Sequence, residues 1–156
     1  MIARPNSLVD DLPQGPYPGS SIFEWTVNGM CISLRLADLD RLGCLLENAE
    51  LKPAPGSRLN VDPAGLAQKL SCLGETLVII EQEKEEGRAV LRSSPPSVDD
   101  TRIDFFELVV DRDEGLSLAR YTYDRAGEGR KMIAAPLTTQ ALGRLMGELK
   151  MLASGN

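Results

Sequence analysis

RIDFFELVVDRDEGLSLARYTYD, residues 102–124, is the stretch that decides the fold. Two runs rich in β-branched and aromatic residues flank a turn at Asp111 to Gly115, and Gly115 supplies the permissive backbone that a tight turn needs. Apolar side chains fall on both faces of the first run, where Glu107 shares a face with Phe105. The pattern predicts two antiparallel strands in a sheet that is at least partly covered on both sides.

The segment after this hairpin predicts a short strand and then a C-terminal helix, with Thr138 or Thr139 as its N-cap. The apolar stripe of the helix consists of Leu142, Leu145, Met146, Leu149 and Leu152. Gly143 and Gly147 lie beside it, and such spacing indicates a close approach by another helix or strand. A dimer contact is therefore predicted at Leu142, Gly143, Met146 and Gly147. Packing of the same face on the chain's own sheet is the equally weighted alternative.

The first half of the chain predicts a hairpin and two short helices. Residues 22–36 show two strand patterns around Asn28-Gly29, a dipeptide typical of two-residue turns. The spacing of leucines in residues 37–48 favours a first helix. A second helix is expected after Asp62, which is a suitable N-cap.

Pro63 suits the first position of that second helix, and Gly74 suits its exit. Residues 75–94 then predict another hairpin, with an apolar centre at 77–80 and a charged, solvated tip. Together these elements predict an α+β fold: a curved antiparallel sheet with a C-terminal helix, an N-terminal hairpin and two short helices.

The first twenty residues have a different character. They include Pro5, Pro13, Pro16 and Pro18, a density that resists both helix formation and strand pairing. We therefore expect a flexible proline-rich arm at residues 1–20 and a single α+β domain at residues 21–156.

The composition argues against an enzyme. The chain has 156 residues, a net charge of −6 and no histidine, which removes the Ser–His and Cys–His nucleophile pairs and every His-containing metal site. Cys31, Cys44 and Cys72 match no zinc or redox spacing, so buried or idle thiols are expected. We expect a cytoplasmic protein with no cofactor, no metal and no membrane segment.

One stretch is locally basic and carries paired tyrosines. Its candidate nucleic-acid-binding residues are Arg120, Tyr121, Tyr123, Arg125, Arg130 and Lys131. Tyrosines on one face of a strand are able to stack on bases, and cations are able to contact phosphates. The alternative, which the sequence favours, is ordinary cross-strand packing in a hairpin of mixed charge.

Residues 114–149, EGLSLARYTYDRAGEGRKMIAAPLTTQALGRLMGEL, resemble the core of the eukaryotic transcriptional coactivators that bind single-stranded DNA. That fold, shared with the plant Whirly proteins, implies a sheet of four strands plus a helix, and a dimer that exchanges helices. Some uncharacterised cyanobacterial proteins are similar in this respect. Tyr121 and Tyr123 fall where the family has its aromatic pair, and Arg125, Arg130 and Lys131 fall near its basic turn. The acidic strand before them departs from the family's basic binding face.

These observations predict a non-enzymatic binding module. Single-stranded nucleic acid, in a role associated with transcription, is its most specific candidate partner. The alternative is an acidic homodimeric protein-interaction module or chaperone-like adaptor, which fits the negative net charge and the small size.

Overall fold

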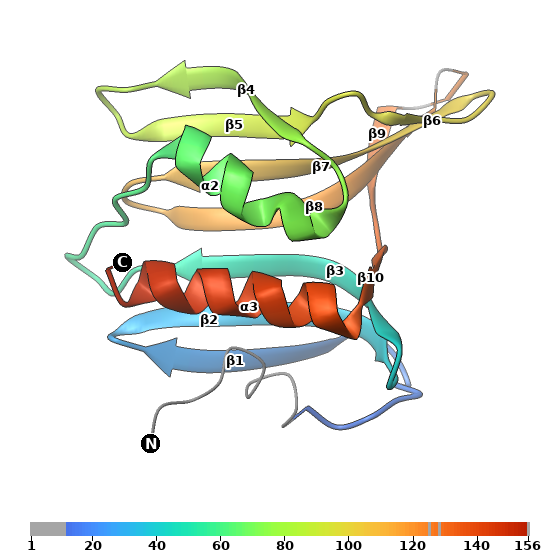
Figure 1. Cartoon of the computed structure of the whole chain (residues 1–156), viewed down its shortest axis with the longest axis horizontal. Helices are drawn as coiled ribbons and strands as arrows, with labels where there is room; N and C mark the ends of the chain where they lie inside the picture. The colour runs from blue at the N-terminus through green and yellow to red at the C-terminus, as the bar shows by residue number, and fades with distance from the viewer. Residues whose placement is uncertain (1–11, 125, 128, 156) are drawn as a thin grey trace.

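The computed structural model describes residues 12–124, 126–127 and 129–155, which form one ten-stranded sheet with helices on one face (Figure 1). The strands are β1 (Ser21–Val27), β2 (Met30–Leu39), β3 (Gly43–Lys52), β4 (Leu77–Glu83), β5 (Arg88–Ser93), β6 (Ser97–Val98), β7 (Arg102–Asp111), β8 (Gly115–Asp124), β9 (Gly129–Ile133) and β10 (Ala135–Thr138). The helices are α2 (Pro63–Lys69), the 3-10 turn η1 (Leu70–Leu73) and α3 (Thr139–Ala153).

The sheet is antiparallel and follows the order β1-β2-β3-β8-β7-β5-β4. Figure 1 shows α2 over the half that ends at β4, and α3 over the half that ends at β1. The prediction of a mostly antiparallel sheet with a C-terminal helix is confirmed. The opposite face of the sheet is not covered by a described helix, and we call it the open face.

The core lies between the sheet and its helices. Strand residues such as Leu34, Leu91, Leu108 and Leu118 are fully buried there, because their side chains alternate toward the helices along each strand. The buried side of α3 supplies Leu142, Leu145, Met146, Leu149 and Ala153. Burial of these aliphatic side chains is the main favourable contribution to folding.

Two short strands link the halves of the sheet. β3 pairs with β8 from Ala49 to Leu51 and with β10 from Gly43 to Leu46, while β9 pairs with the end of β8. Close packing at this junction requires Gly115, which has a φ of +101° and whose missing Cβ would collide with the carbonyl of Leu51. The last third of the chain thus joins both halves.

The helix predicted for residues 37–48 is wrong, because these residues belong to β2, a turn and β3. The leucines that suggested the helix are divided among three elements: Leu39 is in β2, Leu42 is in the turn, and Leu45 and Leu46 are in β3. Asp40 closes the turn, because its Oδ1 accepts hydrogen bonds from the backbone N–H groups of Leu42 and Gly43. Leu42 is 84% exposed, whereas the predicted helix would have buried it.

The predictions from turn and capping chemistry are confirmed. Asn28 and Gly29 both have positive φ values, 51° and 80°, as the two-residue hairpin turn requires. The side chain of Asp62 accepts from the backbone N–H of Gly65 at the start of α2, and Gly74 follows η1 with a φ of 82°. Thr138 caps α3 by accepting from Ala141.

The described part of the N-terminal arm packs against the sheet, unlike the predicted flexible segment. Leu12 is buried in the core, and the backbone N–H of Gly15 donates to the carbonyl of Leu39 at 2.7 Å. Residues 1–11 lie outside the described residues. In the part of the chain that is described, no helix has the length and apolar character needed to cross a membrane.

Candidate functional site

Two surfaces concentrate side chains suited to binding. The first is the open-face cluster, made of Arg92, Phe105, Glu107, Tyr121 and Arg130. Strand register places these residues on one face, because Arg92 is opposite Glu107, Phe105 is opposite Tyr121, and Arg130 is opposite Tyr123. Four strands, β5, β7, β8 and β9, therefore contribute to this cluster.

Glu107 is the centre of the open-face cluster, and its side chain is only 7% exposed. Its Oε2 accepts hydrogen bonds from Arg92 Nε and from Arg130 Nη1, both at 2.7 Å. Burial raises the pKa of this carboxyl, but the hydrogen bonds and charges of Arg130 and Arg92 outweigh burial and hold the pKa below its usual range. One carboxylate thus neutralises part of the charge of two half-exposed arginines.

The aromatic rings of the cluster are already covered by its arginines. Phe105 and Tyr121 stack with ring centroids 6.0 Å apart. The guanidinium of Arg130 lies 4.2 Å from the centroid of Tyr121, and that of Arg92 lies 5.4 Å from Phe105. Tyr121 would accept a stacked base only after Arg130 moves away, whereas the neighbouring Tyr123 is exposed.

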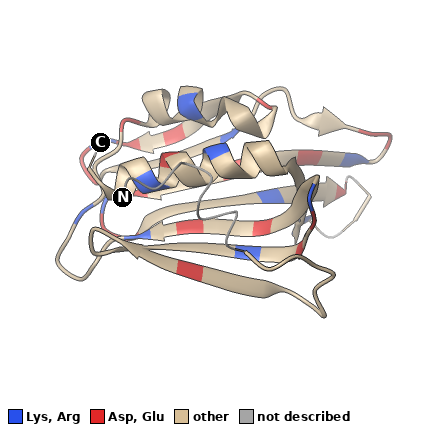
Figure 2. Cartoon of the chain, turned by 60° about the horizontal axis from the view of Figure 1, so that its bottom comes forward, with Lys and Arg blue, Asp and Glu red and all other residues tan. Residues whose placement is uncertain are grey.

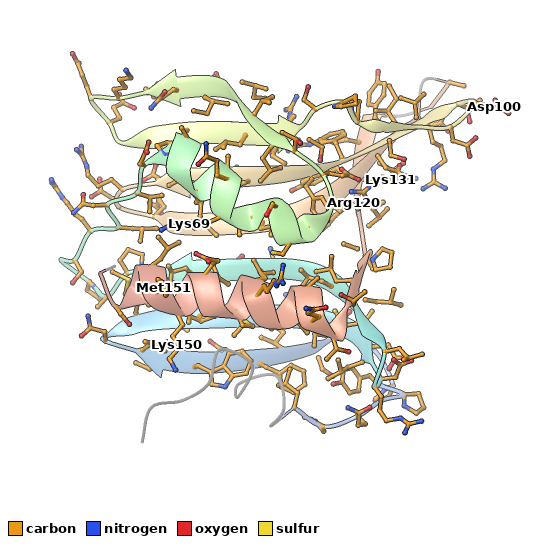
Figure 3. The ribbon with its side chains drawn as sticks, in the orientation of Figure 1. Lys69, Asp100, Arg120, Lys131, Lys150 and Met151 are labelled. Atoms are coloured by element: carbon orange, nitrogen blue, oxygen red, sulfur yellow. The ribbon has the colours of Figure 1, made fainter. Side chains whose placement is uncertain are left out.

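The structure separates the predicted nucleic-acid-binding residues. Tyr121, Tyr123 and Arg130 share the open face. Arg120 and Lys131 are on the helix side of the sheet, where Figure 3 shows them near the end of η1. Arg120 forms an ion pair with Glu75 at 2.9 Å and lies over the ring of Phe106. Arg125 lies outside the described residues.

Sequence reasoning missed Arg92 and assigned Glu107 no functional role. The detectable signal was a glutamate at an apolar position of a central strand, since a buried carboxylate requires partners. The basic character expected of a nucleic-acid surface is also weak. Figure 2 shows Lys and Arg interspersed with Asp and Glu along the strands and helices.

The predicted dimer residues contribute to the chain's own core. Leu142, Gly143 and Met146 are buried where α3 packs on β2, β3, β10 and η1, and Gly147 is half-buried beside them. Figure 3 shows Lys150 and Met151 on the same helix, and Met151 is among its exposed residues. A dimer contact at the three buried residues would require α3 to leave its sheet.

The second surface is the β4 edge groove. Its lining includes Ala64, Ala67 and Gln68 from α2, Ser71 from η1, and Leu77, Val78 and Ile79 from β4. Its volume is about 710 Å³. Among the described strands β4 pairs only with β5, so its outer edge is open. Three consecutive β-branched residues on this edge are exposed: Val78 by 39%, Ile79 by 38% and Ile80 by 46%.

Carboxylates follow this apolar run along the same edge. Glu81, Glu83, Glu85 and Glu86 are all exposed, and none of them takes part in an ion pair with another described residue. The pKa of Glu83 is raised by a hydrogen bond with the side chain of Glu86 and by the negative charge of Glu86. The edge therefore changes from apolar to acidic along its length.

The described residues contain no group of three or more His, Cys, Asp or Glu side chains that could hold a metal ion. Cys31, Cys44 and Cys72 are free thiols, and burial raises the pKa of Cys44 to about 11. A thiol with so high a pKa is mostly protonated near neutral pH and is a poor nucleophile.

Comparison with protein-family models, with curated proteins and with solved structures finds no match to this chain. The resemblance of residues 114–149 to the single-stranded-DNA-binding coactivators stays a prediction.

Proposed function

We propose that this protein is a polypeptide-binding module that takes an extended segment of another protein onto the outer edge of β4. The observation that carries this proposal is the exposed run Val78, Ile79 and Ile80 on an unpaired edge strand beside an apolar groove. Strand addition uses backbone hydrogen bonds for affinity and neighbouring pockets for side-chain selectivity.

An exposed apolar edge is a hazard for a soluble protein, since it is a template for pairing with other chains. Charged side chains, proline, β-bulges and short strand length are the usual protections. The run at Val78 to Ile80 contains no charged residue and no proline, and its strand is seven residues long. A register shift between Ile79 and Glu81 is the one irregularity in its pairing with β5. Such an edge is best explained by a bound strand that covers it.

Amide hydrogen exchange of the full chain tests this proposal. We use the neutral, strand-forming peptide STSIVVTS with blocked ends as the probe, and expect it to slow exchange in β4. The opposite edge strand, β1, is the internal control and should be unchanged. Unaltered exchange in β4 at saturating peptide would contradict strand addition at this edge.

A second candidate function is binding of single-stranded nucleic acid at the open-face cluster. The observation that favours it is that Tyr121, Tyr123 and Arg130 share this face, with Tyr123 exposed. The opposing observation is that Glu107 holds both arginines and Arg130 covers Tyr121.

Titration of labelled single-stranded DNA at low and moderate salt tests this second candidate. We expect weak binding that falls with salt, because few cations at the cluster remain free to contact phosphates. Tight binding that is lost in Tyr123→Ala and Arg130→Ala would establish the nucleic-acid function instead. A basic-to-neutral change on the helix side, Lys131→Gln, is the matched control.

A further inference from the structure

We infer that the segment bound at β4 is basic in its first half and apolar in its second half, and that it runs antiparallel to β4. This inference rests on the proposed function and adds the chemistry and direction of the partner. It is argued from the distribution of charge along the edge, from the topology of the sheet and from the poor fit of a second copy.

The charge on the edge selects for cations. Residues 81–88 carry four carboxylates against Lys84 and Arg88, a net charge of −2. Glu81 and Glu83 are opposite Val90 and Arg88 of β5, which places both on the open-face side of the edge strand together with Val78. The pKa of Glu83 is raised because its hydrogen bond with Glu86 and the charge of Glu86 outweigh the opposing charge of Arg88. Lysine or arginine on an added strand would relieve this repulsion.

The order of the apolar and acidic parts along β4 sets the direction of the bound segment. The N-terminal part of β4 is apolar and its C-terminal part is acidic. Every neighbouring pair in the described sheet is antiparallel. If the added strand also runs antiparallel to β4, its N-terminal part lies beside the acidic C-terminal part of β4. The basic residues of the added strand therefore precede its apolar residues.

A second copy of this chain fits the same edge poorly. Two-fold pairing of β4 centred on Ile79 would place Leu77 opposite Glu81 and Glu75 opposite Glu83. Pairing centred on Ile80 would place Ile79 opposite Glu81 and Glu75 opposite Glu85. Both registers set carboxylates against apolar side chains and against each other, which is unfavourable across strands. Pairing centred on Val78 would place Leu77 opposite Ile79, but it too sets Glu75 opposite a carboxylate, that of Glu81.

Four blocked peptides of equal length test the inference on the full chain: KTKIVVTS, the neutral STSIVVTS, the acidic ETEIVVTS and the reversed STVVIKTK. In the antiparallel register, the two lysines of the first peptide lie beside Glu83 and Glu81, and its three apolar residues lie beside Ile80, Ile79 and Val78. We expect KTKIVVTS to bind about tenfold more tightly than the neutral peptide, and the acidic peptide to bind more weakly still. The reversed peptide should lose the advantage of its lysines.

Charge variants of the protein show where the preference arises. The double change Glu81→Gln with Glu83→Gln should remove the advantage of KTKIVVTS over STSIVVTS. The matched control, Glu24→Gln with Asp100→Asn, removes the same net charge at exposed positions of β1 and of the loop before β7 and should retain the advantage. An advantage that persists in the double variant, or that is equal for the reversed peptide, would overturn the inference.

The outcomes also separate this inference from the proposed function. Protection of β4 by the neutral peptide without any preference for lysine overturns the charge and direction assigned here, and leaves strand addition standing. Failure of all four peptides to protect β4 overturns both. A dimer in solution whose β4 amides are protected without peptide replaces the basic partner with a second copy.

Discussion

Replacing Glu107 with glutamine is expected to lower the free energy of unfolding by about 2 kcal/mol near neutral pH. The substitution keeps the shape of the side chain but removes the charge that two arginines share at 2.7 Å each. Arg92 and Arg130 are half-exposed and regain water, so the cost is smaller than for a fully buried pair. Urea unfolding followed by circular dichroism measures the difference.

The difference in unfolding free energy between the native protein and Glu107→Gln depends on pH. The pKa of Glu107 is lowered in the folded state, so its contribution to stability is complete above the unfolded pKa of about 4.3. That contribution declines as the pH falls through the folded pKa, and the difference between the native protein and Glu107→Gln should shrink with it. A difference in unfolding free energy that stays constant as the pH falls below the folded pKa of Glu107 would contradict the ion-pair explanation.

Glu50→Gln is the matched control for Glu107→Gln. Glu50 also lies on a central strand, but its pair with Lys52, at 3.4 Å, is more exposed to water. We expect this control to change the free energy of unfolding by no more than about 0.5 kcal/mol. Equal effects at both positions would show that the two arginines give Glu107 no special role.

Ile79→Lys is expected to reduce binding of the strand-forming peptide STSIVVTS at least about tenfold while the protein stays folded. Ile79 faces the groove beside α2, so lysine there replaces an apolar contact with a charge that must stay hydrated. The side chain is already 38% exposed, which limits the effect on stability. Fluorescence anisotropy of the labelled peptide measures binding, and thermal unfolding checks the fold.

Ile22→Lys on the opposite edge strand is the control for this prediction. Ile22 is 53% exposed on β1, so the substitution makes the same chemical change at the other end of the sheet. We expect native affinity for this variant. Equal loss in both variants would indicate that the peptide responds to overall apolar exposure rather than to the β4 edge.

Local chemistry in the sequence predicted several elements correctly. The hairpin of β7 and β8, the Asn28-Gly29 turn and the caps at Asp62 and Thr138 depend on residues within a few positions of one another. Residues 37–48 were predicted wrongly because the spacing of their leucines also fits a helix, whereas pairing of β2 with β3 across the Asp40 turn makes them a hairpin.

The candidate sites were predicted less well than the elements. Strand alternation placed Tyr121 and Tyr123 on one face, and the structure agrees. Proximity in the chain grouped Arg120 and Lys131 with them, although alternation turns both toward the helix side. Arg92 was missed because it is 15 positions from Glu107 in the sequence and adjacent to it only across β5 and β7.

The sequence by itself determined the character of each strand and turn: aliphatic and aromatic runs, glycine and aspartate turns, and an apolar run followed by glutamates at residues 77–86. Only the tertiary structure decided which strand is at the edge and which residues meet on the open face. Strand order depends on pairing between segments that are distant in the sequence. The free energy gained by burying their apolar side chains must outweigh the entropy lost when the loops between them close. That order leaves Val78 to Ile80 exposed and brings two arginines onto Glu107.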